Sequence, residues 1–463
     1  MERAKTNEIL PAENEAAEAK GFLELSDEIK ARDVSVIKEL RYTNREVEKE
    51  FLADETMVRP DFVYNNLNRD RAFDNLTAIQ DISDEIKTAQ LSRSESLAAQ
   101  SLLDNVAKRN VLIETCAGYN EANDSVEKAK YAELVRFANE SLYGKPDEAT
   151  FYALLSESLA GIDENSLPEE DAELYRSLKS DIGDIKSATV ERFKPKQETV
   201  ERFSEMIGAL FEGFWKHIPE DKDHFTTRDA CDIANEILRE EIGEDATEYR
   251  AVMSGEQKSV SVSHEKRTII FPVERAKGDF DKQGLKQILA HELGTHVFRA
   301  LVYEKHEIAA LSNALPGNSE IDEGIAKCCE QAVAGKYSDS GVDHYINIGL
   351  ATFKGKNFRE VFEIQQKLQY LKGIKPGESA EEKAARFHAK DSDLFTRTVR
   401  CFRGTGELPN NKDLVYYKGA ERVWRYIEEN IDDPDLIDKL FLSAKSDIFD
   451  ADQQRLIYET KVS

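Results

Sequence analysis

Apolar residues recur at helical spacing through much of the first 205 positions, and this periodicity most constrains the fold. Between about residues 26 and 205 the pattern recurs, for example in Leu102, Leu103 and Val106. Apolar side chains three and four positions apart lie on one face of an α-helix. Turn-forming residues interrupt the pattern at Pro60, YGKPD (143–147) and SLPEED (166–171). We therefore predict long amphipathic helices in this N-terminal region.

The sequence pattern changes after about residue 205. The segments YRAVMSG (249–255) and VSVSHEKRTIIFPV (260–273) alternate or run apolar with β-branched residues, which is typical of strands. Helical spacing then returns in three segments. The first starts near Lys282, the second covers 322–335 and the third covers 357–372. The order of helices, a few strands and further helices predicts an α+β fold that is mostly α.

The first 25 residues are rich in Ala and Glu and poor in large apolar groups, so we expect a flexible arm over residues 1–25. The division predicted here is this arm, a helical N-terminal region over 26–205 and a third region over 206–463. The N-terminus lacks the apolar core of a signal peptide, and the chain has no run of 18 apolar residues. We expect a cytoplasmic protein without a membrane span.

The charge and the cysteines exclude several classes of function. Lys and Arg number 63 against 90 Asp and Glu, so the net charge is −27. Such a surface repels nucleic acid and anionic lipid, and no nucleic-acid partner is expected. The five cysteines are odd in number and never form CxxC, which argues against a disulfide framework or a thiolate zinc cluster. They are predicted to be reduced and mostly buried.

The stretch LAHELGTHVFR (289–299) contains two histidines and a glutamate, as the helices of zinc peptidases do. However, His296 comes one position later than the second histidine of HExxH. Residues five apart lie roughly 140° apart around a regular helix, so His291 and His296 would face different surroundings. One widened turn, a π-bulge, would return both histidines to one face. Gly294 makes such a local distortion less costly.

The motif alone does not establish a metal site, because the dipeptide HE occurs three times in the chain. Only the His291 copy has a second histidine and an apolar helical approach, GLKQILA (284–290). A hydrolytic zinc site needs three protein ligands. Glu323 lies at the start of a later helix, where gluzincins carry their third ligand. Alternatively, Asp322 and Glu323 only complement the dipole of that helix.

Four motifs follow in order: HELGTHVFRA (291–300), EIDEGIA (320–326), RTVRCFRGT (397–405) and KDLVYYKG (412–419). Together they resemble the tyrosine/phenylalanine carboxypeptidase domain family, also called the QEGLA-motif family, whose members carry HExxxH. Weaker similarity in RPDFVYNNLN (59–68) and YGKPD extends the resemblance to roughly residues 55–455. The chain departs from QEGLA, because Asp322 replaces Gln and Ile325 replaces Leu.

The resemblance implies Zn2+ held by His291, His296 and Glu323, with Glu292 as the catalytic carboxylate. It also implies that residues 206–463 are a zinc metallopeptidase catalytic region with a gluzincin-like core. In this chemistry zinc acts as a Lewis acid, and the glutamate carries the proton from the attacking water to the leaving amine.

Removal of a C-terminal residue requires a group that binds a free carboxylate, and arginine can pair with both oxygens. Residues 388–425 hold eight Lys/Arg against five acids, a net charge of +3 in an acidic chain. These charges either line the subsite for the terminal carboxylate or are ordinary solvated and paired surface charges. The candidates for binding this carboxylate are Arg299, Arg397, Arg400, Arg403 and Lys418. Arg299 is equally well explained by pairing with a structural carboxylate. The candidates for stabilising the oxyanion are Arg403, Tyr416 and Tyr417.

The leading hypothesis is a zinc metallocarboxypeptidase that removes a C-terminal Tyr or Phe from a peptide or protein tail. One alternative is a gluzincin-type endopeptidase or aminopeptidase, in which the arginines are structural. The other is a helical interaction protein with a vestigial site. The sequence indicates neither the physiological substrate nor the oligomeric state.

Overall fold

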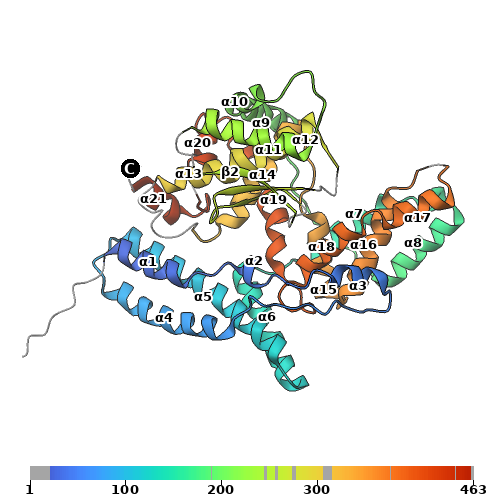
Figure 1. Cartoon of the computed structure of the whole chain (residues 1–463), viewed down its shortest axis with the longest axis horizontal. Helices are drawn as coiled ribbons and strands as arrows, with labels where there is room; N and C mark the ends of the chain where they lie inside the picture. The colour runs from blue at the N-terminus through green and yellow to red at the C-terminus, as the bar shows by residue number, and fades with distance from the viewer. Residues whose placement is uncertain are drawn as a thin grey trace, which may run out of the picture.

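Helices make up most of the molecule (Figure 1). The computed structural model describes residues 21–188, 190–243, 248–255, 259–273, 278–305, 315–375, 377–443 and 445–459. It has 66% helix and 4% strand, so the prediction of a mostly helical α+β fold is confirmed. Among the described helices, none is both long and apolar enough to cross a membrane. All five cysteines are free and buried, as predicted.

The span predicted as a helical N-terminal region is mostly helical, and helices end or begin at or beside the predicted breaks. Its helices are α1 (Phe22–Arg32), α2 (Val36–Glu39), α3 (Val47–Ala53), α4 (Arg69–Thr88), α5 (Arg93–Glu121), α6 (Ser125–Tyr143), α7 (Glu148–Ala160) and α8 (Glu169–Ile182). Asp147 caps α7, because its side chain accepts a hydrogen bond from the Thr150 amide. Residues 1–20 of the predicted arm lie outside the described residues. Helix α1 starts earlier than predicted, because Leu25 is fully buried.

Both predicted strand segments form strands of one small sheet. Strand β4 (Thr268–Pro272) is central: β2 (Arg250–Ser254) pairs with it in parallel and β3 (Ser261–Ser263) pairs with it antiparallel. The pair β1 (His224–Phe225) and β5 (Phe280–Asp281) is separate. The order along the chain is therefore the predicted one of helices, strands and helices.

Most of the chain after α8 is again helical. The elements are α9 (Gln197–Leu210), α10 (Glu212–Lys216), α11 (Thr227–Ile237), the π-helix η2 (Leu238–Ile242), α12 (Lys282–Leu289), the π-helix η4 (Ala290–Val297), α13 (Phe298–Glu304), α14 (Asn318–Ala334), α15 (Val342–Lys354), α16 (Phe358–Lys372), α17 (Ala380–His388), α18 (Asp391–Cys401), the 3-10 turn η6 (Asn411–Asp413), α19 (Leu414–Glu429), α20 (Leu436–Phe441) and α21 (Ala451–Glu459). The segments predicted from Lys282 and over 357–372 match α12 and α16 closely.

Two large apolar cores organise these helices. The first joins α9, α11, α12, α14 and the three-stranded sheet, with Trp424 of α19 among its largest side chains. The second joins α3, α7 and α8 to α15, α16 and α18, so it contains residues from both sides of position 205. The division of the chain into domains at that position stays a prediction. Helix α19 contributes Leu414 and Tyr417 to the second core, so it belongs to both.

Helices α14 and α19 approach closely because a glycine from each lies at the contact. A Cβ atom at Gly324 would overlap the backbone of Gly419, and one at Gly419 would overlap the carbonyl oxygen of Glu320. Packing at this density leaves no space for an added methyl group. The contact therefore fixes α14, the helix that carries Glu323, against α19.

Substitution of Gly419 by alanine should push α14 and α19 apart. We expect Gly419→Ala to lower the free energy of unfolding by about 1–3 kcal/mol, the usual cost of overpacking. Gly208→Ala in α9 is the matched control, since a Cβ there meets nothing within 4 Å. Alanine there should stabilise the helix by about 0.5–1 kcal/mol. Urea denaturation measures both, and similar values for the two variants would contradict a tight contact.

Candidate metal site

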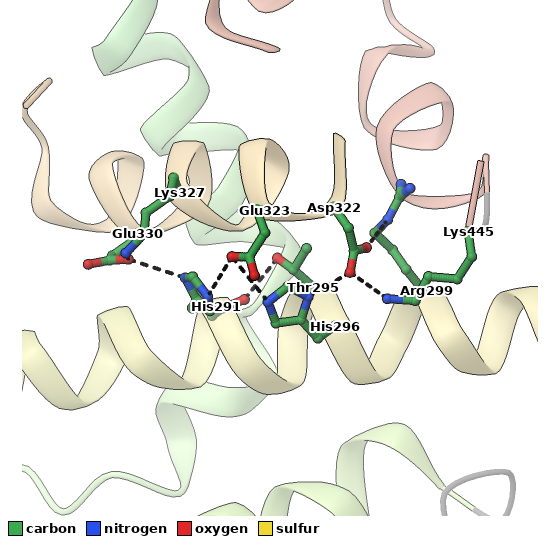
Figure 2. A network of polar contacts seen from close by, with 10 residues as sticks. His291, Thr295, His296, Arg299, Asp322, Glu323, Lys327, Glu330 and Lys445 are labelled. Carbon is green, nitrogen blue, oxygen red and sulfur yellow. Dashed lines mark hydrogen bonds and ion pairs between the residues drawn. The ribbon is translucent and has the colours of Figure 1, made fainter. Parts of the chain in front are cut away.

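The widened turn predicted around the two histidines is present. Residues Ala290–Val297 form the π-helix η4 between α12 and α13. Within it, the Thr295 hydroxyl donates to the carbonyl oxygen of Ala290, five residues earlier. The rings of His291 and His296 therefore lie on one face, with their centroids 4.9 Å apart (Figure 2). A five-residue spacing thus brings the two imidazoles together.

Gly294 has a packing role in the same turn. A Cβ atom at this position would overlap the ring of Phe211, which lies at the end of α9 in the first core. The π-helix is therefore packed tightly against this aromatic ring at Gly294. Glycine at position 294 therefore has two roles: it leaves space for the Phe211 ring, and it makes distortion of the helix less costly.

Glu323 completes a converging set of three ligand atoms. It reaches from α14 and places Oε2 3.8 Å from Nε2 of His291 and 3.9 Å from Nε2 of His296. These separations are too long for hydrogen bonds. Two ligands of one tetrahedral zinc, each about 2.1 Å from the ion, lie about 3.4 Å apart. The separation of Glu323 Oε2 from each histidine Nε2 is therefore close to the spacing of two zinc ligands.

Glu292 belongs to the same cluster. His291, Glu292 and His296 offer ligand atoms that all lie within 4.8 Å of one another, a group that could hold a metal ion. The Glu292 side chain comes from the helix of the histidines and is 5% exposed, whereas Glu323 faces them from the opposite helix. The structure thus brings all four predicted residues to one place.

Each histidine has a carboxylate partner on the ring nitrogen that faces away from Glu323. Nδ1 of His291 lies 3.2 Å from Glu330, and Nδ1 of His296 lies 2.7 Å from Asp322. In a neutral imidazole, a carboxylate that accepts Nδ1–H leaves Nε2 unprotonated, the state that a metal ligand needs. Burial raises the pKa of Glu330, but His291 and Lys327 outweigh it and lower that pKa to about 2. Glu330 is therefore ionised and can hold the imidazole.

No family model, curated protein or solved structure matches the chain. The chemistry of the site therefore has to be inferred from its own residues.

Asp322 is the centre of a buried charge cluster. It accepts hydrogen bonds from Arg299 Nε at 3.0 Å and from Lys445 Nζ at 2.5 Å, besides its contact with His296. Burial raises the pKa of Asp322, but the three cationic or imidazole partners hold it well below its usual value. Sequence analysis did not assign this role to Asp322, although its place beside Glu323 was a signal. Glu330 was also missed; it lies seven residues after Glu323, on the same helical face.

Arg299 is not available to bind the carboxylate of a substrate. Its side chain is completely buried and also donates to the Leu440 carbonyl and the Ser443 hydroxyl. The structure therefore supports the other explanation, pairing with the structural carboxylate of Asp322.

Removal of this buried cation should be costly. We expect Arg299→Met to lower the free energy of unfolding by about 3 kcal/mol, because Asp322 and two further acceptors lose a donor inside the protein. Arg176→Met is the control, since Arg176 forms an exposed ion pair with Glu169. Its loss should cost less than about 1 kcal/mol. Equal midpoints in urea denaturation would show that the buried pair contributes no more than an exposed one.

Most candidates from the basic stretch are occupied by protein groups. Arg397 pairs with Asp343 and Asp393. Arg400 makes two hydrogen bonds to Asp413. Neither arginine is therefore a free carboxylate receptor.

The candidates on α19 separate into different surroundings. Tyr417 is buried in the second core and accepts a hydrogen bond from Arg192, away from the histidines. Lys418 donates to the carbonyl oxygen of Lys145. Tyr416 interacts electrostatically with Glu323, and burial together with Glu323 raises its pKa. Its phenol is therefore protonated and remains a candidate hydrogen-bond donor at the site.

Two neighbouring cations of the basic stretch have side chains without a hydrogen-bonded acceptor among the described residues. One is Arg403, whose Nη1 is buried and unpartnered. The other is Lys412, which interacts electrostatically with Asp413, Arg403 and Glu323 and whose pKa is lowered by burial. Sequence analysis missed Lys412, although it begins the motif KDLVYYKG inside the basic stretch. The positive charges of Arg403 and Lys412 could therefore attract one anion.

Proposed function

We propose that this protein is a zinc metallocarboxypeptidase with a gluzincin-like core, which removes a C-terminal aromatic residue from a peptide or protein tail. The observation that carries the proposal is the convergence of two imidazole Nε2 atoms and the Glu323 carboxylate. This donor set, two histidines and one glutamate, is one that catalytic zinc uses. The resemblance of four sequence motifs to the tyrosine/phenylalanine carboxypeptidase domain family supports it independently.

His291, His296 and Glu323 would hold the ion, and Asp322 and Glu330 would orient the two imidazoles. When bound, zinc would supply Lewis acidity that lowers the pKa of water to about 7. Glu292 would accept the proton of the attacking water on its carboxylate and pass it to the leaving amine. Tyr416 would donate a hydrogen bond to the oxygen of the attacked carbonyl.

Arg403 and Lys412 would bind the terminal carboxylate of the substrate. Neither side chain has a hydrogen-bonded acceptor in the part of the chain that the structure describes, and Lys412 interacts with Glu323. A free carboxylate would satisfy this charge, whereas an amide or an internal peptide bond would not. This selectivity favours an exopeptidase over an endopeptidase. The preference for Tyr or Phe rests on the family resemblance.

The test compares peptides that end in Tyr and carry either a free or an amidated C-terminus. The N-terminus of each peptide is acetylated, so that aminopeptidase action is silent. We expect stoichiometric zinc in the purified protein and release of free Tyr from the free C-terminus only. Equal cleavage of both peptides would reject carboxypeptidase action. Absence of zinc after loading would reject the metal site as well.

A further inference from the structure

A C-terminal segment contacts both helices that carry the metal-binding residues. We call residues 440–443 and 445–447 the C-terminal strap. The carbonyl of Leu440 and the hydroxyl of Ser443 accept hydrogen bonds from Arg299, which follows η4 in the chain. Lys445 reaches Asp322 on α14, and its carbonyl oxygen accepts from the Leu315 amide at 2.8 Å. The strap thus joins the helix of the histidines to the helix of Glu323.

The oxygens of Asp322 connect the strap to His296. Oδ2 accepts from both His296 Nδ1, at 2.7 Å, and Lys445 Nζ, at 2.5 Å. Oδ1 accepts from Arg299 Nε. Figure 2 shows Asp322 between the histidine on one side and the two cations on the other. The direction of the imidazole therefore depends on a carboxylate whose orientation is fixed by two buried cations.

The charges of the cluster make these residues depend on one another. Lys445 is 3% exposed and Asp322 5%, so each would be a costly buried charge without its partner. A neutral glutamine at position 322, as in QEGLA, would leave Arg299 and Lys445 without the carboxylate that accepts their hydrogen bonds. In this chain, the negative charge that Asp322 introduces in place of Gln is balanced in part by Lys445 of the strap.

We infer that Asp322 and Lys445 are positioning residues of the metal site, through which docking of the C-terminal strap and metal binding favour each other. Asp322 holds His296 with Nε2 toward Glu323, and Lys445 holds Asp322. Thermodynamic linkage then requires that the metal stabilise the docked strap by as much as the docked strap strengthens metal binding. The inference rests on the metal binding of the proposed function but not on peptide hydrolysis.

The first experiment measures the dissociation constant for zinc by competition with a chromophoric chelator. Lys445→Met is expected to bind zinc about 10–100-fold more weakly, the usual effect of losing an outer partner of a metal ligand. Lys439→Met is the matched control, because this lysine lies just before the strap on α20 and pairs with Asp433 at the surface. The control should bind zinc as the wild type does. Equal affinity in a folded Lys445→Met variant would overturn the inference.

The second experiment uses the wild-type protein, so it remains decisive if Lys445→Met does not fold. Hydrogen exchange of peptides that cover residues 436–447 is measured with and without zinc. Slower exchange of these peptides with zinc, but not of peptides from α4, supports the linkage, and unchanged exchange overturns it. If the wild type binds no zinc at all, the proposed function fails at its first step. If it binds zinc without either effect, only the inference fails.

Discussion

Glu292→Gln should lower kcat by about 10²–10⁴-fold, the range that general acid–base catalysis contributes. The amide has nearly the size of the carboxylate but cannot accept the proton of the attacking water. Glu292 lies within 4.8 Å of the ligand atoms of both histidines, so its position suits this role. The three proposed ligands are unchanged, and zinc should stay bound.

The experiment separates catalysis from metal binding by measuring both in one preparation. Zinc content is determined by mass spectrometry, and kcat is determined with the peptide that ends in Tyr. Glu304→Gln is the control, because Glu304 ends α13 and pairs with Arg267 at the surface. A Glu292→Gln variant that retains zinc and the wild-type kcat would exclude Glu292 as the proton carrier.

A double variant, Arg403→Met with Lys412→Met, should abolish the distinction between free and amidated C-termini. Each charge-assisted hydrogen bond to the carboxylate contributes about 1.5–3 kcal/mol, so both together correspond to about 10²–10⁴-fold in kcat/KM. Cleavage of the free peptide should fall by this factor, with zinc affinity retained. The two peptides should then react at similar low rates.

Arg397→Met and Lys418→Met are the matched controls for this experiment. Arg397 is held by two aspartates, and Lys418 donates to a backbone carbonyl. Both lie in the same basic stretch, so they test whether general positive charge is sufficient. Substantial loss of activity in the controls, or full discrimination in the double variant, would assign the carboxylate to another group.

The elements of the fold could be predicted because their signals are local. The breaks at 143–147 and 166–171 contain turn residues, and the helical spacing of the flanking segments ends there. The widened turn follows from two histidines that must share one face although they are five positions apart. Local patterns of this kind do not depend on what packs against them.

The partners of the charged residues could not be predicted in the same way. Arg397, Arg400 and Arg403 look alike in sequence. Only the fold brings Asp343 to Arg397 and leaves Nη1 of Arg403 without a hydrogen-bond partner among the described residues. Lys445 meets Asp322 across more than a hundred residues. These pairings depend on the tertiary arrangement, which a single sequence does not reveal.

Tyr416 and Tyr417 show the same limit on a smaller scale. They are neighbours on α19, but successive residues of a helix point about 100° apart. One interacts with Glu323 and the other packs in the second core. Sequence analysis offered both as donors because nothing local distinguishes them.

Helix α19 belongs to both cores, and this has a consequence for the length of the product. In the proposed enzyme the metal-binding residues lie on η4 and α14. The cations that bind the terminal carboxylate of the substrate, Arg403 and Lys412, lie just before α19. Because the single helix α19 packs in both cores, the distance between these cations and the metal-binding residues stays constant. Each cut would then remove one residue, whatever the length of the tail that enters.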